Sequence, residues 1–210
     1  MATGMPGAKD DRLINSGFTS DFQEGEKMSR LPVIEPAKLS ADQRQVYDTI
    51  AAGPRAGVRG PFLALMHVPE LAHRIQHLGE YLRYKTLFPP RLSELAILIT
   101  ARHYTCQYEW HAHEPHAQKG GLAQSIIDAI KEKRRPNAMQ SDETAVFDFA
   151  TELLRNGKVP DTVYEAVVQG FGTRGAIELG ALIGYYIMIA MTLLAHEVAL
   201  PPDKALPLRE

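Results

Sequence analysis

A stretch without charged side chains, residues 179–195, constrains the fold of this chain more than any other feature. It is at the short limit of length for a membrane-spanning helix, and the sequence holds no second apolar stretch of that kind. Gly180 and Gly184 lie four residues apart within it, a spacing that lets another helix approach closely, either within one chain or between subunits. We therefore expect a helix that is buried in a core or at a subunit interface, with no membrane span.

Cap and turn residues divide the rest of the chain into further helices. Ser40 and Gln43 form a capping-box pattern before a helix that ends at Gly53, and residues 57–61 are predicted to be a loop. Apolar residues at helical spacing follow Pro69. The further helices are expected at 91–103, 106–119, around 126–130, 141–157, 160–168 and 174–197, with a break at 170–172. Because no alternating strand pattern is present, the predicted fold class is all-α.

The domain organisation follows from length and composition. A chain of 210 residues is typical of one domain with a tail. Residues 1–29 are mixed in charge and lack an apolar stretch, so we expect a disordered extension and no secretory signal. Residues 30–202 are predicted to form a single helical domain, and residues 203–210 a tail.

Charge and cysteine content exclude some classes of protein. The 23 basic and 25 acidic side chains nearly balance, and no Lys/Arg cluster is long enough to indicate a nucleic-acid partner. Cys106 is the one cysteine, so no disulfide framework within the chain is possible. This fits a reducing environment, and we expect a cytoplasmic location.

Residues with chemical potential are dense between 105 and 116. On a helix, Cys106, Glu109, His113 and His116 share one face. Glu109 and His113 are one turn apart and are expected to hydrogen-bond, which fixes the tautomer of the imidazole and raises its basicity for proton transfer. The alternative is a solvated pair worth only ~0.2–0.5 kcal/mol.

Three further side chains near this helix have open roles. Cys106 is expected near the helix N-terminus, where the dipole lowers a thiol pKa, although a small buried hydrophobic residue is the commoner role for cysteine. Glu94, one helix earlier, either stays at the surface as a helix-start acid or turns inward as a second carboxylate. Arg102 either holds a substrate carboxylate or pairs with an acid.

A metal site is a further alternative for the histidine-rich segment. Glu109, His113 and His116 are the residue types of a two-histidine, one-carboxylate set. The spacing of the two histidines differs from the His-Glu-x-x-His pattern, and Pro115 perturbs the helix between them. We therefore expect no metal site.

Several short motifs together resemble the carboxymuconolactone decarboxylase family. They are Arg-x-x-Glu-Leu-Ala at 91–96, Tyr-Glu-Trp-x-x-His at 108–113 and Ala-x-x-Gly at 117–120. A C-terminal stretch, 174–193, is also similar through its Arg-Gly, Glu-Leu, Gly-Tyr-Tyr and Ala-Met-Thr-Leu elements. The resemblance extends over most of the chain, from about residue 30 to residue 202.

The family that this sequence resembles includes two types of enzyme. One decarboxylates γ-carboxymuconolactone without a metal or organic cofactor. The other, the AhpD-like alkylhydroperoxidases, uses a Cys-x-x-Cys pair with a histidine four residues later and a glutamate twelve residues earlier. Glu94, Cys106 and His113 match three of these positions, whereas Glu109 replaces the second cysteine. Without a resolving thiol, the disulfide-forming peroxidase cycle cannot close within one chain.

The resemblance implies an AhpD-like helical bundle that assembles as a trimer or hexamer. We expect a cofactor-free, carboxymuconolactone decarboxylase-like enzyme whose substrate is a small carboxylated lactone or related cyclic acid. The expected catalytic residues are His113 as acid/base, Glu109 as its orienting partner and Glu94 as a second carboxylate. The expected substrate-binding residues are Cys106, Arg102 and His116.

Two other functions remain open. One is a redox protein in which Cys106 alone is oxidised by peroxide and is resolved by an external thiol. The other is a non-catalytic, oligomeric ligand-binding protein that keeps the pocket.

Overall fold

The computed structural model describes residues 29–55 and 57–209, and all the regular elements in these residues are helical. This confirms the predicted all-α class. In chain order the elements are the 3-10 turn η2 (Pro36–Lys38), α1 (Ala41–Ala52), α2 (Pro61–Leu65), α3 (Pro69–Tyr84), α4 (Pro90–His103), α5 (Gln107–Lys119), α6 (Gln124–Lys131), α7 (Ser141–Asn156) and α8 (Asp161–Ala195).

Capping boxes begin α1 and α7, and a proline begins each of α2, α3 and α4. The capping box before α1 forms as predicted, with the backbone N–H of Gln43 donating to Ser40 Oγ at 3.2 Å and the backbone N–H of Ser40 donating to Gln43 Oε1 at 3.0 Å. The short helix α2 was expected to be loop or unassigned. It forms because Gly60, at a φ of 58°, turns the chain and Pro61 supplies a preset first helical residue.

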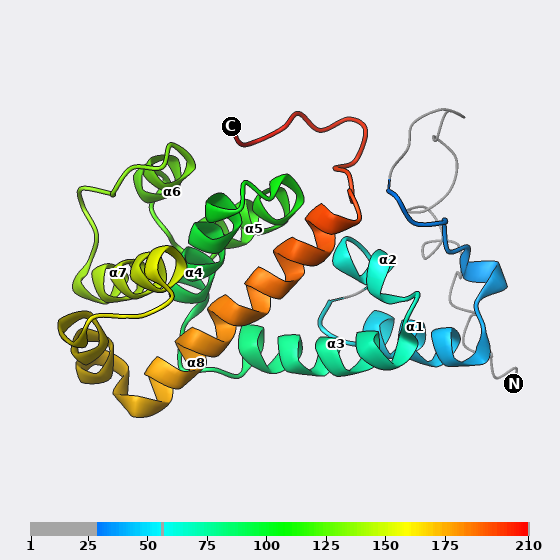
Figure 1. Cartoon of the computed structure of the whole chain (residues 1–210), viewed down its shortest axis with the longest axis horizontal. Helices are drawn as coiled ribbons and strands as arrows, with labels where there is room; N and C mark the ends of the chain where they lie inside the picture. The colour runs from blue at the N-terminus through cyan, green and yellow to red at the C-terminus, as the bar shows by residue number, and fades with distance from the viewer. Residues whose placement is uncertain (1–28, 56, 210) are drawn as a thin grey trace, which may run out of the picture.

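Helix α4 lies at the centre of the fold. It packs against α5, α6, α7 and α8, and its residues from Leu92 to Arg102 are all buried. Figure 1 shows the second part of α8 running diagonally between a group formed by α4–α7 and a group formed by α1–α3. Side chains of α4, α5 and α8 therefore meet in the interior.

Helix α8 contains the uncharged stretch and bends within its length. Gly172, with a φ of 67° and a ψ of 177°, interrupts the helix inside the predicted 170–172 break. Among the described residues, α8 is the one helix whose length and composition would allow it to cross a membrane. Half of its most apolar window is buried within the chain, as expected for a core helix, while Ile177, Met191 and Leu194 remain exposed.

Both ends of the described chain are attached to the helical domain. Residues 1–28, which carry nearly all of the predicted extension, lie outside the described residues, whereas Ser29 Oγ donates to the carbonyl of His196 at 2.8 Å. The tail after residue 202 is extended, but Leu208 is buried and exchanges two hydrogen bonds of 2.9 Å with the side-chain amide of Gln107. The tail thus packs on the domain.

Candidate active site

A carboxylate and an imidazole meet where α4 packs against α5. Glu94 Oε2 lies 2.6 Å from Nδ1 of His113, and the two residues are 6% and 8% exposed. Of the two positions considered for Glu94, the structure has the inward one. The predicted hydrogen bond between Glu109 and His113 does not form. His113 instead pairs with Glu94 from the neighbouring helix α4.

The charge states of Glu94 and His113 follow from their surroundings. Burial opposes the ionisation of Glu94, but His113 and Arg83 outweigh it and lower the pKa of this carboxyl. Burial lowers the pKa of His113, and Glu94 offsets only part of that effect. An ionised Glu94 accepts the proton of Nδ1, which leaves Nε2 of a neutral His113 as a base.

Glu109 is a buried carboxyl group without a partner. It is 1% exposed, and among the described residues neither of its oxygens has a hydrogen-bond partner. Burial, and then the negative charge of Glu94, raise its pKa well above the usual value. The raised pKa favours the protonated form of Glu109, a carboxylic acid that can donate a proton. Two carboxyl groups whose pKa values are shifted in opposite directions in one cluster are an arrangement that acid/base enzymes use.

Two other helices contribute residues to this cluster that sequence analysis did not assign. Arg83 of α3 places Nη2 3.8 Å from Glu94 Oε1. Tyr186 of α8 presents its ring edge-on to His113, with centroids 5.0 Å apart. Tyr185 packs against Tyr186 at 5.3 Å. The Gly-Tyr-Tyr element was a sequence signal for the tyrosines, whereas Arg83 stands in an ordinary amphipathic helix and gave no signal.

Cys106 is the N-cap residue of α5, as the sequence predicted, but its thiol is not activated. The residue is 1% exposed, and burial together with the nearby Glu109 raises the pKa of the thiol to about 12. The expectation that the helix dipole lowers this pKa is therefore wrong, because loss of hydration outweighs the dipole. Cys106 is part of the hydrophobic core.

The guanidinium of Arg102 bonds to neighbouring segments of the chain. It donates to the carbonyls of Lys131 and Arg209, each at 2.8 Å, and to Thr105 Oγ1 at 2.9 Å. None of these bonds goes to an acidic side chain. Two of them hold the C-terminal tail and the end of α6. These contacts give Arg102 a structural role, and its substrate-binding role stays a prediction.

His116 lies at the edge of the cluster. Helix α5 continues through Pro115, and the ring of His116 is 6.0 Å from that of His113 while the residue is exposed. Within the described ranges, no three His, Cys, Asp or Glu side chains form a group able to hold a metal ion.

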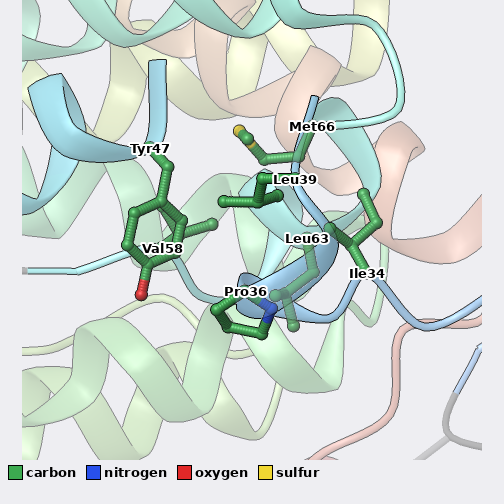
Figure 2. A pocket seen from close by; sticks show the side chains of 7 residues that line it. All are labelled: Ile34, Pro36, Leu39, Tyr47, Val58, Leu63 and Met66. Atoms are coloured by element: carbon green, nitrogen blue, oxygen red, sulfur yellow. The ribbon is translucent and has the colours of Figure 1, made fainter. Parts of the chain in front are cut away.

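Two hollows lie away from the cluster. Figure 2 shows the first, whose cavity volume of about 20 Å³ is room for roughly one water molecule. Its lining residues are Ile34, Pro36, Leu39, Tyr47, Val58, Leu63 and Met66. The second, of about 320 Å³, is open and lies between α6 and the loop that follows it. Neither of these two hollows is lined by Glu94, Glu109 or His113.

No protein-family model matches the sequence, and no curated protein matches it. Solved structures do match. A peroxidase-related protein from Ralstonia eutropha JMP134, described as an alkylhydroperoxidase AhpD core, superposes with a TM-score of 0.71 over 85% of this chain and 95% of its own, at 20% identity.

The chain has the AhpD-like fold. A protein of unknown function from Agrobacterium tumefaciens, with a suggested role as the antioxidant defence protein AhpD, also matches. Its TM-score is 0.60 over 66% of this chain and 96% of its own, at 16% identity. At these identities the likeness extends to the fold alone. The AhpD-like fold expected from the sequence motifs is thereby confirmed.

Proposed function

We propose that this AhpD-fold chain is a cofactor-free acid/base enzyme that decarboxylates a small carboxylated lactone or related cyclic acid. One observation carries the proposal. Glu109, a buried carboxyl group whose pKa is raised, shares a cluster with His113, whose pKa is lowered and whose Nδ1 lies 2.6 Å from Glu94 Oε2. The likeness to the decarboxylase family in the 91–120 motifs supports the choice of reaction.

The cluster supplies what the reaction needs. The bond between the ring carbon and the carboxylate carbon breaks, carbon dioxide leaves, and the electron pair is delocalised into the adjacent unsaturated lactone. The resulting enolate takes a proton on carbon from the carboxylic acid of Glu109. His113 then transfers a proton from solvent to Glu109, which restores the starting state. A positioned acid of this kind contributes ~10²–10⁴-fold to rate.

The roles of the two glutamates differ from the sequence-based expectation. Glu94 orients His113, and Glu109 is itself the proton donor. Cys106 forms part of the wall beside Glu109, and His116 lies at the rim near His113.

A turnover assay tests the proposal. Metal-stripped protein is incubated with γ-carboxymuconolactone, and loss of substrate absorbance is followed together with release of carbon dioxide. We expect turnover in the parent chain, and a loss of 10²-fold or more in kcat for Glu109→Gln and for His113→Ala. Arg74→Gln, at an exposed site on α3, is the matched control. Absence of decarboxylation at high enzyme concentration contradicts the choice of substrate.

A second candidate is a single-cysteine peroxidase. The descriptions of the two structural neighbours, one peroxidase-related and one suggested for antioxidant defence, favour it. In this reaction the thiolate of Cys106 attacks the peroxide, the O–O bond breaks, an alcohol leaves, and an external thiol reduces the sulfenic acid. Peroxide consumption that is lost in Cys106→Ser supports this candidate, and its absence with a thiol pKa of 8.5 or higher removes it.

The third candidate is a non-catalytic ligand-binding protein. Two results together favour it. Glu109→Gln and His113→Ala bind a lactone acid as tightly as the parent chain does, and neither the variants nor the parent chain shows turnover. In all three cases we propose a homo-oligomer, a trimer or hexamer, since exposed apolar side chains such as Ile177 and Leu194 remain on α8. We propose a cytoplasmic location because the single cysteine fits a reducing environment.

A further inference from the structure

Two arginines extend the polar cluster beyond its acid/base residues. Arg55, in the loop after α1, donates from Nη2 to the hydroxyl of Tyr185 at 3.2 Å and lies over the ring of Phe62 at 4.7 Å. Arg83 places Nη2 3.8 Å from Glu94 Oε1, with its side chain 13% exposed. The Nε atoms of both arginines are buried and have no hydrogen-bond partner in the described part of the chain. Unpaired buried donors are rare in native proteins and need an explanation, such as a strained contact, a water or a bound ligand that accepts from them.

The tyrosine pair joins these arginines to the catalytic groups. Tyr185 accepts the hydrogen bond from Arg55, so its own O–H is available to donate. Tyr186 lies between Tyr185 and His113, at 5.3 Å from the first ring and 5.0 Å from the second. Arg83 acts electrostatically on both tyrosines. The donors of Arg55, Arg83 and Tyr185 thus belong to one continuous site with His113.

A glycine holds Arg55 and Tyr185 close to α3. A Cβ atom at position 79 would collide with the hydroxyl of Tyr185 and with Nη2 of Arg55. Gly79 is therefore required for the present positions of both groups, and any side chain there displaces them from the site.

Two guanidinium groups lie near one carboxylate of the cluster. Arg55 is half-buried, whereas Arg83 is mostly buried and places Nη2 3.8 Å from Glu94 Oε1. Burial raises the pKa of Glu109 and lowers that of His113, which disfavours the charged form of each. Glu80, which also acts on Arg55, is paired with Lys85 at 2.7 Å. A single anion between the two guanidinium groups would offset the second positive charge.

We propose that Arg55, Arg83 and Tyr185 form a subsite that binds one carboxylate of a small organic acid. This inference rests on the proposed function and deepens it. The carboxylate held here is the one that the substrate retains, while a second carboxylate faces Glu109 and is lost as carbon dioxide. Guanidinium groups suit this role because they bind a carboxylate through two parallel hydrogen bonds.

The test uses a lactone acid that cannot react. The saturated probe 5-oxotetrahydrofuran-2-carboxylate has no ring double bond to receive electrons, and its methyl ester has the same shape without the charge. Isothermal titration of the full chain is expected to show binding of the acid and at least tenfold weaker binding of the ester. Inorganic phosphate, titrated separately, distinguishes a carboxylate site from a general anion site and is expected to bind more weakly than the acid.

Variants locate the subsite. Arg83→Gln, Arg55→Gln and Gly79→Ala are each expected to weaken binding of the acid at least tenfold, with Arg83→Lys intermediate. Arg74→Gln, exposed on the same helix as Arg83, is expected to bind as the parent does. If circular dichroism shows that a glutamine variant does not fold, two other measurements decide whether the subsite exists. They are the binding of the acid to Arg83→Lys and the comparison of acid with ester in the parent chain.

Three results overturn the subsite. They are no binding of the acid to the parent chain, equal binding of acid and ester, and parent-like binding by both arginine variants. Tighter binding of phosphate than of the acid overturns the carboxylate assignment. Glu109→Gln is expected to bind the acid normally but to lose turnover. Binding that depends on Arg83 in a chain without any decarboxylation contradicts the proposed reaction and leaves the subsite intact.

Discussion

Glu94 and His113 are nineteen residues apart in the chain, and their side chains join α4 to α5 through a buried contact of 2.6 Å between Oε2 and Nδ1. This contact fixes the orientation of the imidazole and leaves Nε2 as the base. Glu109, on the same helix as His113, has no such partner among the described residues, and burial raises its pKa.

Replacing Glu94 by glutamine tests the orienting role. The amide keeps the size of the side chain but removes the negative charge that holds the proton on Nδ1 of His113. We expect kcat to fall about 10²–10⁴-fold with a smaller change in KM, because the imidazole tautomer is no longer fixed. Nitrogen NMR of His113 should show a mixture of tautomers. Glu70→Gln, at an exposed position on α3, is expected to match the parent, and a fully active Glu94→Gln would contradict the role.

Glu109 gives stability a defined pH dependence. The pKa of Glu109 is raised in the native state above the ordinary value of 4.5. Its contribution to the free energy of unfolding is therefore full below pH 4.5 and is lost as pH rises toward the native pKa. Glu109→Gln should therefore have a higher free energy of unfolding than the parent at pH 8, with a smaller difference at pH 4. Each unit of pKa elevation corresponds to about 1.4 kcal/mol.

Urea unfolding at pH 4, 6 and 8 measures this difference. Glu152→Gln, at a surface carboxylate, is the control for the loss of one charge. A difference between Glu109→Gln and the parent that stays constant across the three pH values would show that Glu109 is ionised in the native state.

Burial of Cys106 predicts an unreactive thiol. Because the pKa of the thiol is raised to about 12, almost no thiolate exists at pH 8 and the sulfur is shielded from solvent. A thiol reagent such as iodoacetamide should label the native chain at least 10²-fold more slowly than the chain in urea. Cys106→Ala should keep decarboxylase turnover. Prompt labelling of the native chain would favour the peroxidase candidate instead.

Arg102 is expected to contribute stability and no substrate affinity. Arg102→Ala removes three hydrogen bonds of the guanidinium, of which two tie the end of α6 and the tail to α4 and the third reaches Thr105. We expect a loss of about 2–4 kcal/mol in unfolding free energy and faster proteolysis near the C-terminus, with an unchanged KM at a temperature where the variant is folded. A KM that rises tenfold or more would support the substrate-binding role.

Exposed apolar residues on α8 predict assembly. Ile177 is 66% exposed, and Met191 and Leu194 on the same helix are also exposed. Light scattering coupled to size exclusion should show a trimer or hexamer in the parent chain. Ile177→Glu with Leu194→Glu should shift it to smaller species, whereas Lys158→Glu on the exposed turn after α7 should not. A monomeric parent chain would contradict the proposed assembly.

The sequence by itself determined the helices and their boundaries, because these depend on neighbours a few residues apart. The Ser40 capping box, the break that Gly172 makes and the uncharged second part of α8 all follow from local hydrogen bonding, glycine geometry and apolar spacing. The short helix α2 escaped prediction because five residues give too little periodicity.

Only the tertiary structure decided which groups form the candidate site. The partner of His113 comes from a different helix, and Arg83 and Tyr186 reach the same cluster from α3 and α8. The loss of thiolate character at Cys106 likewise depends on burial by distant segments. The physical reason is that pKa values and side-chain partners are set by desolvation and by contacts across packed helices, and neither quantity is a property of sequence spacing.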